Sequence, residues 1–275
     1  MRALVRTWRT AGEGVALVPT MGDLHAGHLA LVERAREQSR RVVVSIFVNP
    51  LQFGAGEDYE TYPRTLERDR ERLAALGVDA VFAPDVTALY PRGLEQAVRV
   101  VVPELEDILC GAERPGHFAG VATVVTRLFN SVEPDLAVFG EKDYQQLLII
   151  QRLIDDLAFG IELCAVPTVR EADGLALSSR NRYLSAEQRA IAPELHAALR
   201  AAADAIAGGE RNFPQVSERA RERLAAAGLE PGYFEVRRAV DLAPATANDH
   251  AHDLRVLAAA RLGAARLIDN IAVGG

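Results

Sequence analysis

The fold is decided by one stretch near the N-terminus, Val15-Ala16-Leu17-Val18-Pro19-Thr20-Met21-Gly22-Asp23-Leu24-His25-Ala26-Gly27-His28. Its apolar start, 15–19, is typical of a buried strand, and a segment with helical spacing follows at about 28–40. The two histidines therefore lie in a strand-to-helix turn, where the unpaired N–H groups of the first helical turn point outward. Together with the positive end of the helix dipole, this geometry favours a bound anion such as phosphate.

Strands alternate with helices through the first two-thirds of the chain. Further strands are predicted at 42–48, 79–83, 135–139 and 161–166, helices at 64–76, 118–132 and 144–157, and an extended stretch near 98–102. The run 42–48 is β-branched without alternation, as expected for a strand buried on both faces. Repeated strand–helix–strand units predict an α/β fold with a doubly wound, Rossmann-like parallel sheet that binds ligands at the carboxyl ends of its strands.

A change in composition after about residue 170 indicates a second, smaller α+β domain. Helices are predicted at 186–208 and 214–227, strands at 233–240 and 254–260, and a last element at 264–273. We therefore expect a Rossmann-like domain over residues 1–170 and a C-terminal domain over residues 171–275.

Composition narrows the functional classes. Of 275 residues, 49% are hydrophobic and 25% charged, as in an ordinary globular protein. The formal net charge of −7 disfavours non-specific binding to nucleic acid or anionic membranes. No apolar run reaches the ~18–20 residues of a membrane span, the first 14 residues lack a secretory signal, and Cys110 and Cys164 form no CxxC pair. We expect a cytoplasmic protein with neither a nucleic-acid nor a membrane partner.

Composition also singles out Lys142 and Met21. The basic residues are 30 arginines and one lysine, and Met21 is the only methionine besides the first residue. Lys142 follows the predicted strand 135–139, where a compact ammonium on a flexible stem suits a phosphate; an incidental surface lysine is the alternative. Met21 either lines a pocket beside the histidines or fills the core.

Several blocks resemble the pantoate–β-alanine ligase (pantothenate synthetase) family, which shares a His-x-Gly-His signature with a larger nucleotidyltransferase superfamily. In chain order the blocks are Pro19–His28, Ile46–Gly54, Tyr62–Thr65, Phe139–Gln146 and Ser178–Asn181. The resemblance implies an ATP-dependent condensation of pantoate with β-alanine through pantoyl adenylate, releasing pyrophosphate and AMP. It also implies Mg²⁺, a homodimer, a first domain that binds ATP and pantoate, and a second domain that covers the active site.

The resemblance further implies roles for single residues. Around the reacting phosphates it places His25, His28, Lys142, Ser178, Ser179 and Arg180. Against ATP it places Pro19, Met21, Gly27, Gly140, Asp143, Val169 and Leu177. Against pantoate it places Met21, Phe47, Asn49, Gln52, Phe139 and Gln146, and near the metal Asp69. For the two phenylalanines ordinary core packing is the alternative, and for Asp69 a solvated position on a helix.

The implied chemistry agrees with the residue types. A carboxylate nucleophile, with a pKa near ~4, is already ionised at pH 7 and needs no general base. The demand is for cations and hydrogen-bond donors around crowded phosphates. Other classes stay open, namely another adenylyl-transferring ligase with a different acid and a non-catalytic ATP sensor, whereas size and acidic charge disfavour a tRNA-charging enzyme.

Some features receive weaker assignments. Glycines and acids at 54–59 predict a mobile lid that shields the acyl adenylate from water. For His25 and His28, a zinc pair or plain helix caps are the alternatives to phosphate binding. His250 and His252 are expected in a solvated loop, with a metal cluster as the alternative, and His117 lies in a family-like block without an assigned role.

Overall fold

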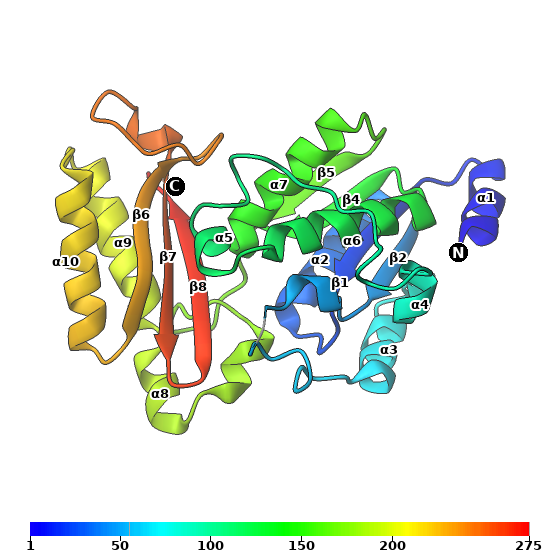
Figure 1. Cartoon of the computed structure of the whole chain (residues 1–275), viewed down its shortest axis with the longest axis horizontal. Coiled ribbons are helices and arrows are strands. Elements are labelled where there is room, and N and C mark those ends of the chain that lie inside the picture. Colours follow the sequence, from blue (N-terminus) through cyan, green and yellow to red (C-terminus); the bar gives the residue numbers. More distant parts are fainter. Residues whose placement is uncertain (55, 275) are drawn as a thin grey trace. The chain divides into compact units, whose positions relative to one another are not determined.

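The computed structural model describes residues 1–54 and 56–274. The chain forms two compact units (Figure 1): unit 1 comprises residues 1–141 and 146–167, and unit 2 comprises residues 142–145 and the chain from Thr168 onward. Two separate segments of the chain therefore contribute to unit 2. Within the described ranges, every helix is too short or too polar to cross a bilayer.

Unit 1 contains a five-stranded sheet in the order β3-β2-β1-β4-β5, with every pairing parallel. Its strands are β1 (Val15–Thr20), β2 (Arg41–Ile46), β3 (Ala80–Phe82), β4 (Leu136–Gly140) and β5 (Glu162–Val166). From β1 the chain proceeds outward to β2 and β3, then returns to place β4 on the other side of β1. The predicted doubly wound sheet is confirmed, and its switch point lies at the carboxyl ends of β1 and β4.

Helices bury both faces of the central strands. Those of unit 1 are α1 (Arg2–Thr10), α2 (Ala26–Gln38), α3 (Leu66–Ala75), α4 (Val86–Leu89), α5 (Cys110–Glu113), α6 (His117–Val132) and α7 (Tyr144–Asp156), whose first two residues belong to unit 2, with the 3-10 turns η1 (Pro50–Gln52) and η2 (Glu141–Asp143). Helix α2 packs against β1, β2 and β4, and α6 packs against β1 and η1. Val15 to Val18 are consequently inaccessible to solvent, which explains their continuous apolar run.

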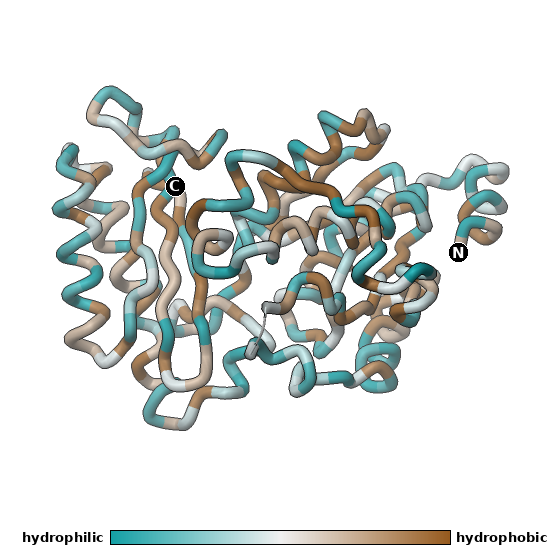
Figure 2. The backbone as a smooth tube through the Cα atoms, in the orientation of Figure 1, coloured by the Kyte–Doolittle hydropathy of each residue, from teal (hydrophilic) through white to brown (hydrophobic). Residues whose placement is uncertain are grey.

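Unit 2 is a three-stranded antiparallel sheet covered by helices. It contains the turns η3 (Ser179–Tyr183) and η4 (Ala251–Asp253), the helices α8 (Ala186–Ile191), α9 (Glu194–Ala207) and α10 (Phe213–Ala226), and the strands β6 (Glu230–Arg238), β7 (Leu254–Leu262) and β8 (Ala265–Ala272). Helix α9 packs against β7 and β8, and α10 packs against β6. In Figure 2 most of β7 is brown or beige, whereas α10 is largely teal, as expected for a helix with one solvated face.

One local prediction was wrong, and two stretches need comment. The predicted helix 186–208 is divided into α8 and α9, because Pro193 at the start of α9 has no N–H to continue the ladder of α8. The stretch 98–102, predicted as extended, lies outside the described helices and strands, and Val98 is 74% exposed. Helix α1 was not predicted; it buries Val5 and Trp8 as a short apolar stripe.

Candidate active site

A buried carboxylate holds the turn between β1 and α2. Asp69 of α3 has no exposed surface. Its Oδ2 accepts hydrogen bonds from the backbone N–H of Asp23 and the hydroxyl of Thr65, and its Oδ1 accepts one from the N–H of Leu24, each at 2.9 Å. The backbone leading into His25 is therefore fixed by a side chain from another helix.

Asp69, predicted near the metal, has both carboxylate oxygens engaged by donors of the protein itself. Its two oxygens face three protein donors, and a Cβ at Gly22, where φ is +86°, would lie 3.2 Å from Oδ2. Across residues 1–54 and 56–274, no group of three or more His, Cys, Asp or Glu side chains is placed to hold a metal ion by itself. Asp69 anchors the turn and is buried, so the alternative of a solvated position on a helix is wrong.

His25 and His28 form a reciprocal cap at the N-terminus of α2. Nδ1 of His25 accepts a hydrogen bond from the N–H of Gly27 at 3.2 Å, and Nδ1 of His28 accepts one from the N–H of His25 at 3.3 Å. The ring centroids lie 4.1 Å apart. A nitrogen that accepts carries no proton, so each neutral imidazole has its N–H at Nε2. Capping therefore gives both rings the tautomer that can donate to an anion, beside the positive end of the helix dipole.

Three residues predicted to contact pantoate lie together in unit 1. Met21 follows β1, and its Sδ accepts a hydrogen bond from Nε2 of Gln52 at 3.2 Å. Oε1 of Gln52 accepts one from Nδ2 of Asn49 at 3.0 Å. The structure thus joins Met21, Gln52 and Asn49 in one chain of hydrogen bonds.

The Asn49 side chain is buried and fully engaged. Besides Gln52, its Nδ2 donates to the carbonyl of Gly120 at 3.1 Å. Its Oδ1 accepts from the hydroxyl of Tyr90 at 2.8 Å and from the N–H of Leu51 at 3.3 Å. An amide offers two donor and two acceptor positions, and all four are used here. Asn49 is therefore placed to orient the side chain of Gln52.

Tyr90 is a residue that sequence reasoning missed. It lies at the end of α4 and is 2% exposed. Burial raises the pKa of its hydroxyl to about 12, although the charges of Arg127 and Arg99 oppose this, so the hydroxyl stays protonated and donates. A single tyrosine at the end of a short helix carries no pattern that marks it in the sequence.

Arg114 and His117 hold the backbone of Gln52. Its carbonyl oxygen accepts from Nη2 of Arg114 at 3.2 Å and lies 2.7 Å from Nδ1 of His117. Nη1 of Arg114 lies 2.9 Å from Nε2 of His117. Because a guanidinium only donates, Nε2 of His117 accepts and its Nδ1–H donates to the carbonyl. His117, which had no assigned role in the sequence analysis, thus supports the backbone of a residue predicted to bind pantoate.

The same arginine pairs with Glu57 in the predicted lid. Two hydrogen bonds of 2.7 and 2.5 Å join the guanidinium to the carboxylate. Burial raises the pKa of Glu57, but the hydrogen bond and charge of Arg114 outweigh it and lower the pKa to about 2. The predicted lid, 54–59, includes Ala55, which lies outside the described residues.

The remaining predicted residues of unit 1 lie near the switch point or in the core. Pro19 and Gly140 lie in the carboxyl-terminal parts of the neighbouring strands β1 and β4, and Gly27 lies in the first turn of α2. Phe47 and Phe139 are 7% and 5% exposed, so core packing accounts for most of their surface. Gln146 is half-buried on α7.

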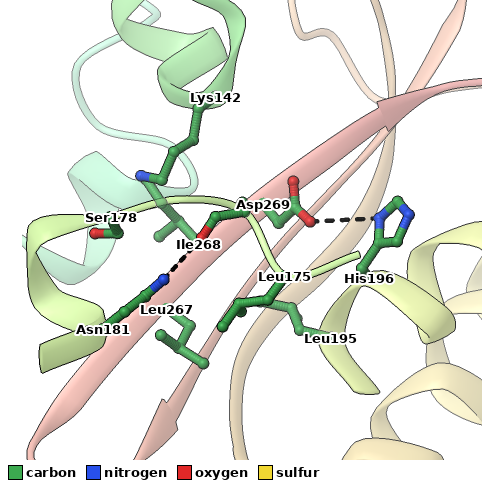
Figure 3. A pocket seen from close by; sticks show the side chains of 10 residues that line it. Lys142, Leu175, Ser178, Asn181, Leu195, His196, Leu267, Ile268 and Asp269 are labelled. Atoms are coloured by element: carbon green, nitrogen blue, oxygen red, sulfur yellow. Dashed lines mark hydrogen bonds and ion pairs between the residues drawn. The ribbon is translucent and has the colours of Figure 1, made fainter. Parts of the chain in front are cut away.

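Unit 2 holds a small cavity that contains the lone lysine (Figure 3). Its lining consists of Lys142, Leu175, Ala176, Ser178, Asn181, Leu195, His196, Leu267, Ile268 and Asp269. The Lys142 ammonium lies 3.8 Å from a carboxylate oxygen of Asp143, and its side chain is 20% exposed. Ser178 caps η3, with its Oγ accepting from the N–H of Arg180 at 3.2 Å. The structure therefore brings Lys142 and Ser178 to one cavity.

Other predicted residues of unit 2 lie close to these. Ser179 and Arg180 begin η3 directly after Ser178, and both are half-buried. The N–H of Leu177 donates to the carbonyl of Val169 at 3.0 Å, so the two residues predicted to contact ATP are neighbours.

The histidines of the C-terminal loop lie apart from these groups in the chain. His250 and His252 stack with ring centroids 5.5 Å apart, and His252 is 76% exposed beside Asp253. This is the surface loop that the sequence predicted.

The fold and the capped helix define a class of protein. A parallel sheet in the order β3-β2-β1-β4-β5, with a helix N-terminus and two imidazoles at the switch point, belongs to the nucleotide-binding α/β proteins. Within that class the chain is a member of the pantoate–β-alanine ligase family, since the family model described as Pantoate-beta-alanine ligase matches residues 1–272.

Individual relatives agree over nearly the whole chain. A pantothenate synthetase of Thioalkalivibrio sulfidiphilus is 58% identical over 273 residues, covering 99% of this chain and 95% of the relative. One of Pseudomonas fluorescens (strain Pf0-1) is 55% identical over 271 residues, covering 98% of this chain and 94% of the relative.

Solved structures show the same similarity in three dimensions. The pantothenate synthetase of Thermus thermophilus superposes with a TM-score of 0.90 at 51% identity, covering 98% of this chain and 97% of that one. A pantoate-beta-alanine ligase of Francisella tularensis, complexed with Beta-gamma ATP and Beta-alanine, gives a TM-score of 0.79 at 32% identity, covering 98% and 96%.

Proposed function

We propose that this chain condenses pantoate with β-alanine to form pantothenate, using ATP. A carboxylate oxygen of pantoate attacks the α-phosphorus, the bond from that phosphorus to the bridging oxygen breaks, and pyrophosphate leaves. The amine of β-alanine then attacks the acyl carbon, AMP leaves, and the nitrogen loses a proton as the amide forms. The capped pair His25 and His28 at the switch point, in a chain of this family, is the observation that carries the proposal.

The phosphate-facing residues act by placing positive charge and donors where negative charge develops. His25 and His28 supply their Nε2–H groups at the positive end of the α2 dipole. Lys142 and Arg180 supply cations, and Ser178 and Ser179 supply hydroxyls. Since pantoate arrives ionised, these groups need only orient it and stabilise the transition state.

The other predicted residues select the substrates. We assign the nucleotide to Pro19, Met21, Gly27, Gly140, Asp143, Val169 and Leu177, and pantoate to Met21, Phe47, Phe139, Gln52 and Gln146. Glutamine amides suit the hydroxyl and carboxylate of pantoate, because each both donates and accepts. Asn49 enters the proposal through its hydrogen bond to Gln52.

Isotope transfer tests the reaction directly. With pantoate labelled with ¹⁸O in its carboxylate, the proposal predicts one labelled oxygen in AMP, pyrophosphate release that depends on pantoate, and AMP release that depends on β-alanine. Release of ADP and phosphate, or dependence on a different acid, would overturn it, and ATP binding without turnover would indicate the sensor. Lys142→Ala should slow pyrophosphate release about 100-fold or more, as expected for a lost electrostatic contact.

Three further parts of the proposal rest on the family alone. Mg²⁺ accompanies ATP, held by phosphates and water. The chain is a homodimer, which light scattering tests as a mass near twice the 29.8 kDa of the chain. The enzyme works in the cytoplasm, where ATP is available.

A further inference from the structure

We propose that Asn270 on β8, held by Arg255 on β7, positions Lys142 for the ligase reaction. This inference rests on the proposed function of Lys142. Neither Asn270 nor Arg255 lies in a sequence block that resembles the family signature.

A buried side chain holds the backbone of Lys142. Nδ2 of Asn270 donates a hydrogen bond to the Lys142 carbonyl at 3.0 Å, and Asn270 is 5% exposed. Its Oδ1 accepts from Nη1 of Arg255 at 2.5 Å. Because a guanidinium only donates, the amide must turn its oxygen toward Arg255 and its nitrogen toward the carbonyl. Arg255 therefore sets the orientation that Lys142 requires.

Arg255 makes a second contact with the same segment. Its guanidinium carbon lies 3.7 Å from the centroid of the Tyr144 ring, close enough for a cation–π interaction. The hydroxyl of Tyr144 donates to the carbonyl of Ala239 at 3.0 Å. The segment 142–145 is thus attached to the rest of unit 2 at Lys142 and at Tyr144. These contacts explain why the segment belongs to unit 2 although it directly follows β4.

The register of the sheet brings Asn270 and Arg255 together. Asn270 pairs with Leu257, and Arg255 pairs with Ala272. Asn270 and Arg255 are therefore diagonal neighbours on one face of the sheet, within reach of long side chains. A shift by one residue would turn Asn270 to the opposite face, away from Arg255.

The preceding residue, Asp269, lies on the opposite face of the sheet and binds Arg170, in the second segment that enters unit 2. Its carboxylate accepts two hydrogen bonds from Arg170, of 2.6 and 2.9 Å. Burial by itself would raise the pKa of Asp269. His196, whose Nδ1 lies 3.6 Å away (Figure 3), and Arg170 lower the pKa by more than burial raises it, so the net shift is downward. Asp269 and Asn270, consecutive residues of β8, thus each hold one of the two segments of unit 2, at Arg170 and at Lys142.

The consequence for Lys142 is preorganisation. Four rotatable bonds lie between the Lys142 backbone and its ammonium. A backbone that also moved would add to the positions that the ammonium samples, so a fixed backbone narrows them. An error of about 1 Å in the position of a group can cost about 100-fold in rate. Loss of the Asn270 contact should therefore reduce kcat more than it changes the affinity for ATP.

Asn270→Asp separates the two bonds of the amide, because it keeps an oxygen for Arg255 and loses the donor to Lys142. Asn212→Asp is the matched control: Asn212 caps α10, where its Oδ1 accepts from the N–H of Gln215, and aspartate caps equally well. We expect kcat for pantoate-dependent pyrophosphate release to fall about 10- to 100-fold in Asn270→Asp. KM for ATP should change less than about threefold, and Asn212→Asp should match the unmodified protein.

The single lysine permits a direct spectroscopic test. Protein labelled with [1-¹³C]lysine gives one lysine carbonyl signal, from Lys142. Loss of the hydrogen bond should shift this signal in Asn270→Asp and leave it in place in Asn212→Asp. An unshifted signal, or an unchanged kcat, would overturn the inference.

Two further arms keep the result interpretable. If Asn270→Asp fails to fold, Arg255→Gln carries the test, because it weakens the orienting bond to Asn270 and should shift the same signal with a smaller fall in kcat; no change in either would overturn the inference. If the unmodified protein releases no pyrophosphate, the proposed function is wrong, whereas the carbonyl signal still reports whether Asn270 holds Lys142.

Discussion

The side-chain amide of Asn49 donates a hydrogen bond of 3.0 Å to Oε1 of Gln52. It is one step in a directed chain, in which the hydroxyl of Tyr90 donates to Asn49, Asn49 donates to Gln52, and Gln52 donates to Sδ of Met21. The glutamine assigned to pantoate is thus oriented from the interior of unit 1. Under the proposed function, the orientation of the Gln52 amide depends on the buried side chains of Asn49 and Tyr90.

Tyr90→Phe removes the first donor of this chain. It leaves Oδ1 of Asn49 buried with one partner fewer, which should cost about 1–3 kcal/mol in the free energy of unfolding. We expect KM for pantoate to rise and KM for ATP to stay nearly constant. Denaturant unfolding and steady-state kinetics measure the two effects, and equal changes in both KM values would argue against a role through Gln52.

His25→Asn separates capping from phosphate binding. Asparagine caps a helix as well as any residue, so Tm should fall little. It has no donor at the place of Nε2, so kcat should fall about 10- to 100-fold. His25→Ala is the comparison variant and should lose both stability and rate. Full activity in His25→Asn would show that the imidazole serves only as a cap.

Glu57 predicts a pH dependence of stability. Its folded pKa of about 2 lies below the ordinary value of 4.5, and the folded state therefore favours the ionised form. The contribution is fully present above pH 4.5 and is lost as pH falls toward 2. Because the side chain is 26% exposed, solvent screening limits it to about 1–3 kcal/mol.

Glu57→Gln tests this sign. The variant should be less stable than the unmodified protein at pH 6, and the difference in the free energy of unfolding should shrink toward pH 2 as the natural carboxylate is protonated. Urea unfolding across this pH range measures the difference. A gap that stays constant with pH would mean that the ion pair with Arg114 contributes nothing.

Gly120→Ala tests the close approach of α6 to η1. A Cβ at Gly120 would lie 2.1 Å from the carbonyl oxygen of Leu51, so the turn that carries Gln52 must move. We expect a loss of about 3 kcal/mol in the free energy of unfolding and a raised KM for pantoate. Gly160→Ala is the control, because a Cβ there meets nothing within 4 Å, and it should leave both quantities nearly unchanged.

The sequence by itself determined the architecture and the place of the site. A central parallel strand is buried on both faces, and this is why Val15–Val18 form a continuous apolar run. The pattern of apolar residues along the chain therefore indicates the sheet directly. The position of His25 and His28 between that strand and a helix likewise predicts where an anion would bind. These are local properties, readable within about ten residues.

Only the tertiary structure decided which residues support the site. Asp69, expected on a solvated helix face or near a metal, is buried beneath the turn before His25. The Tyr90 and Asn49 hydrogen bond spans 41 residues of sequence, and that of Asn270 with Lys142 spans 128. Such contacts depend on sheet register and on how distant segments pack, and neither leaves a periodic trace in a single sequence. The long-range hydrogen-bond partners of the site residues are therefore decided by the tertiary structure alone.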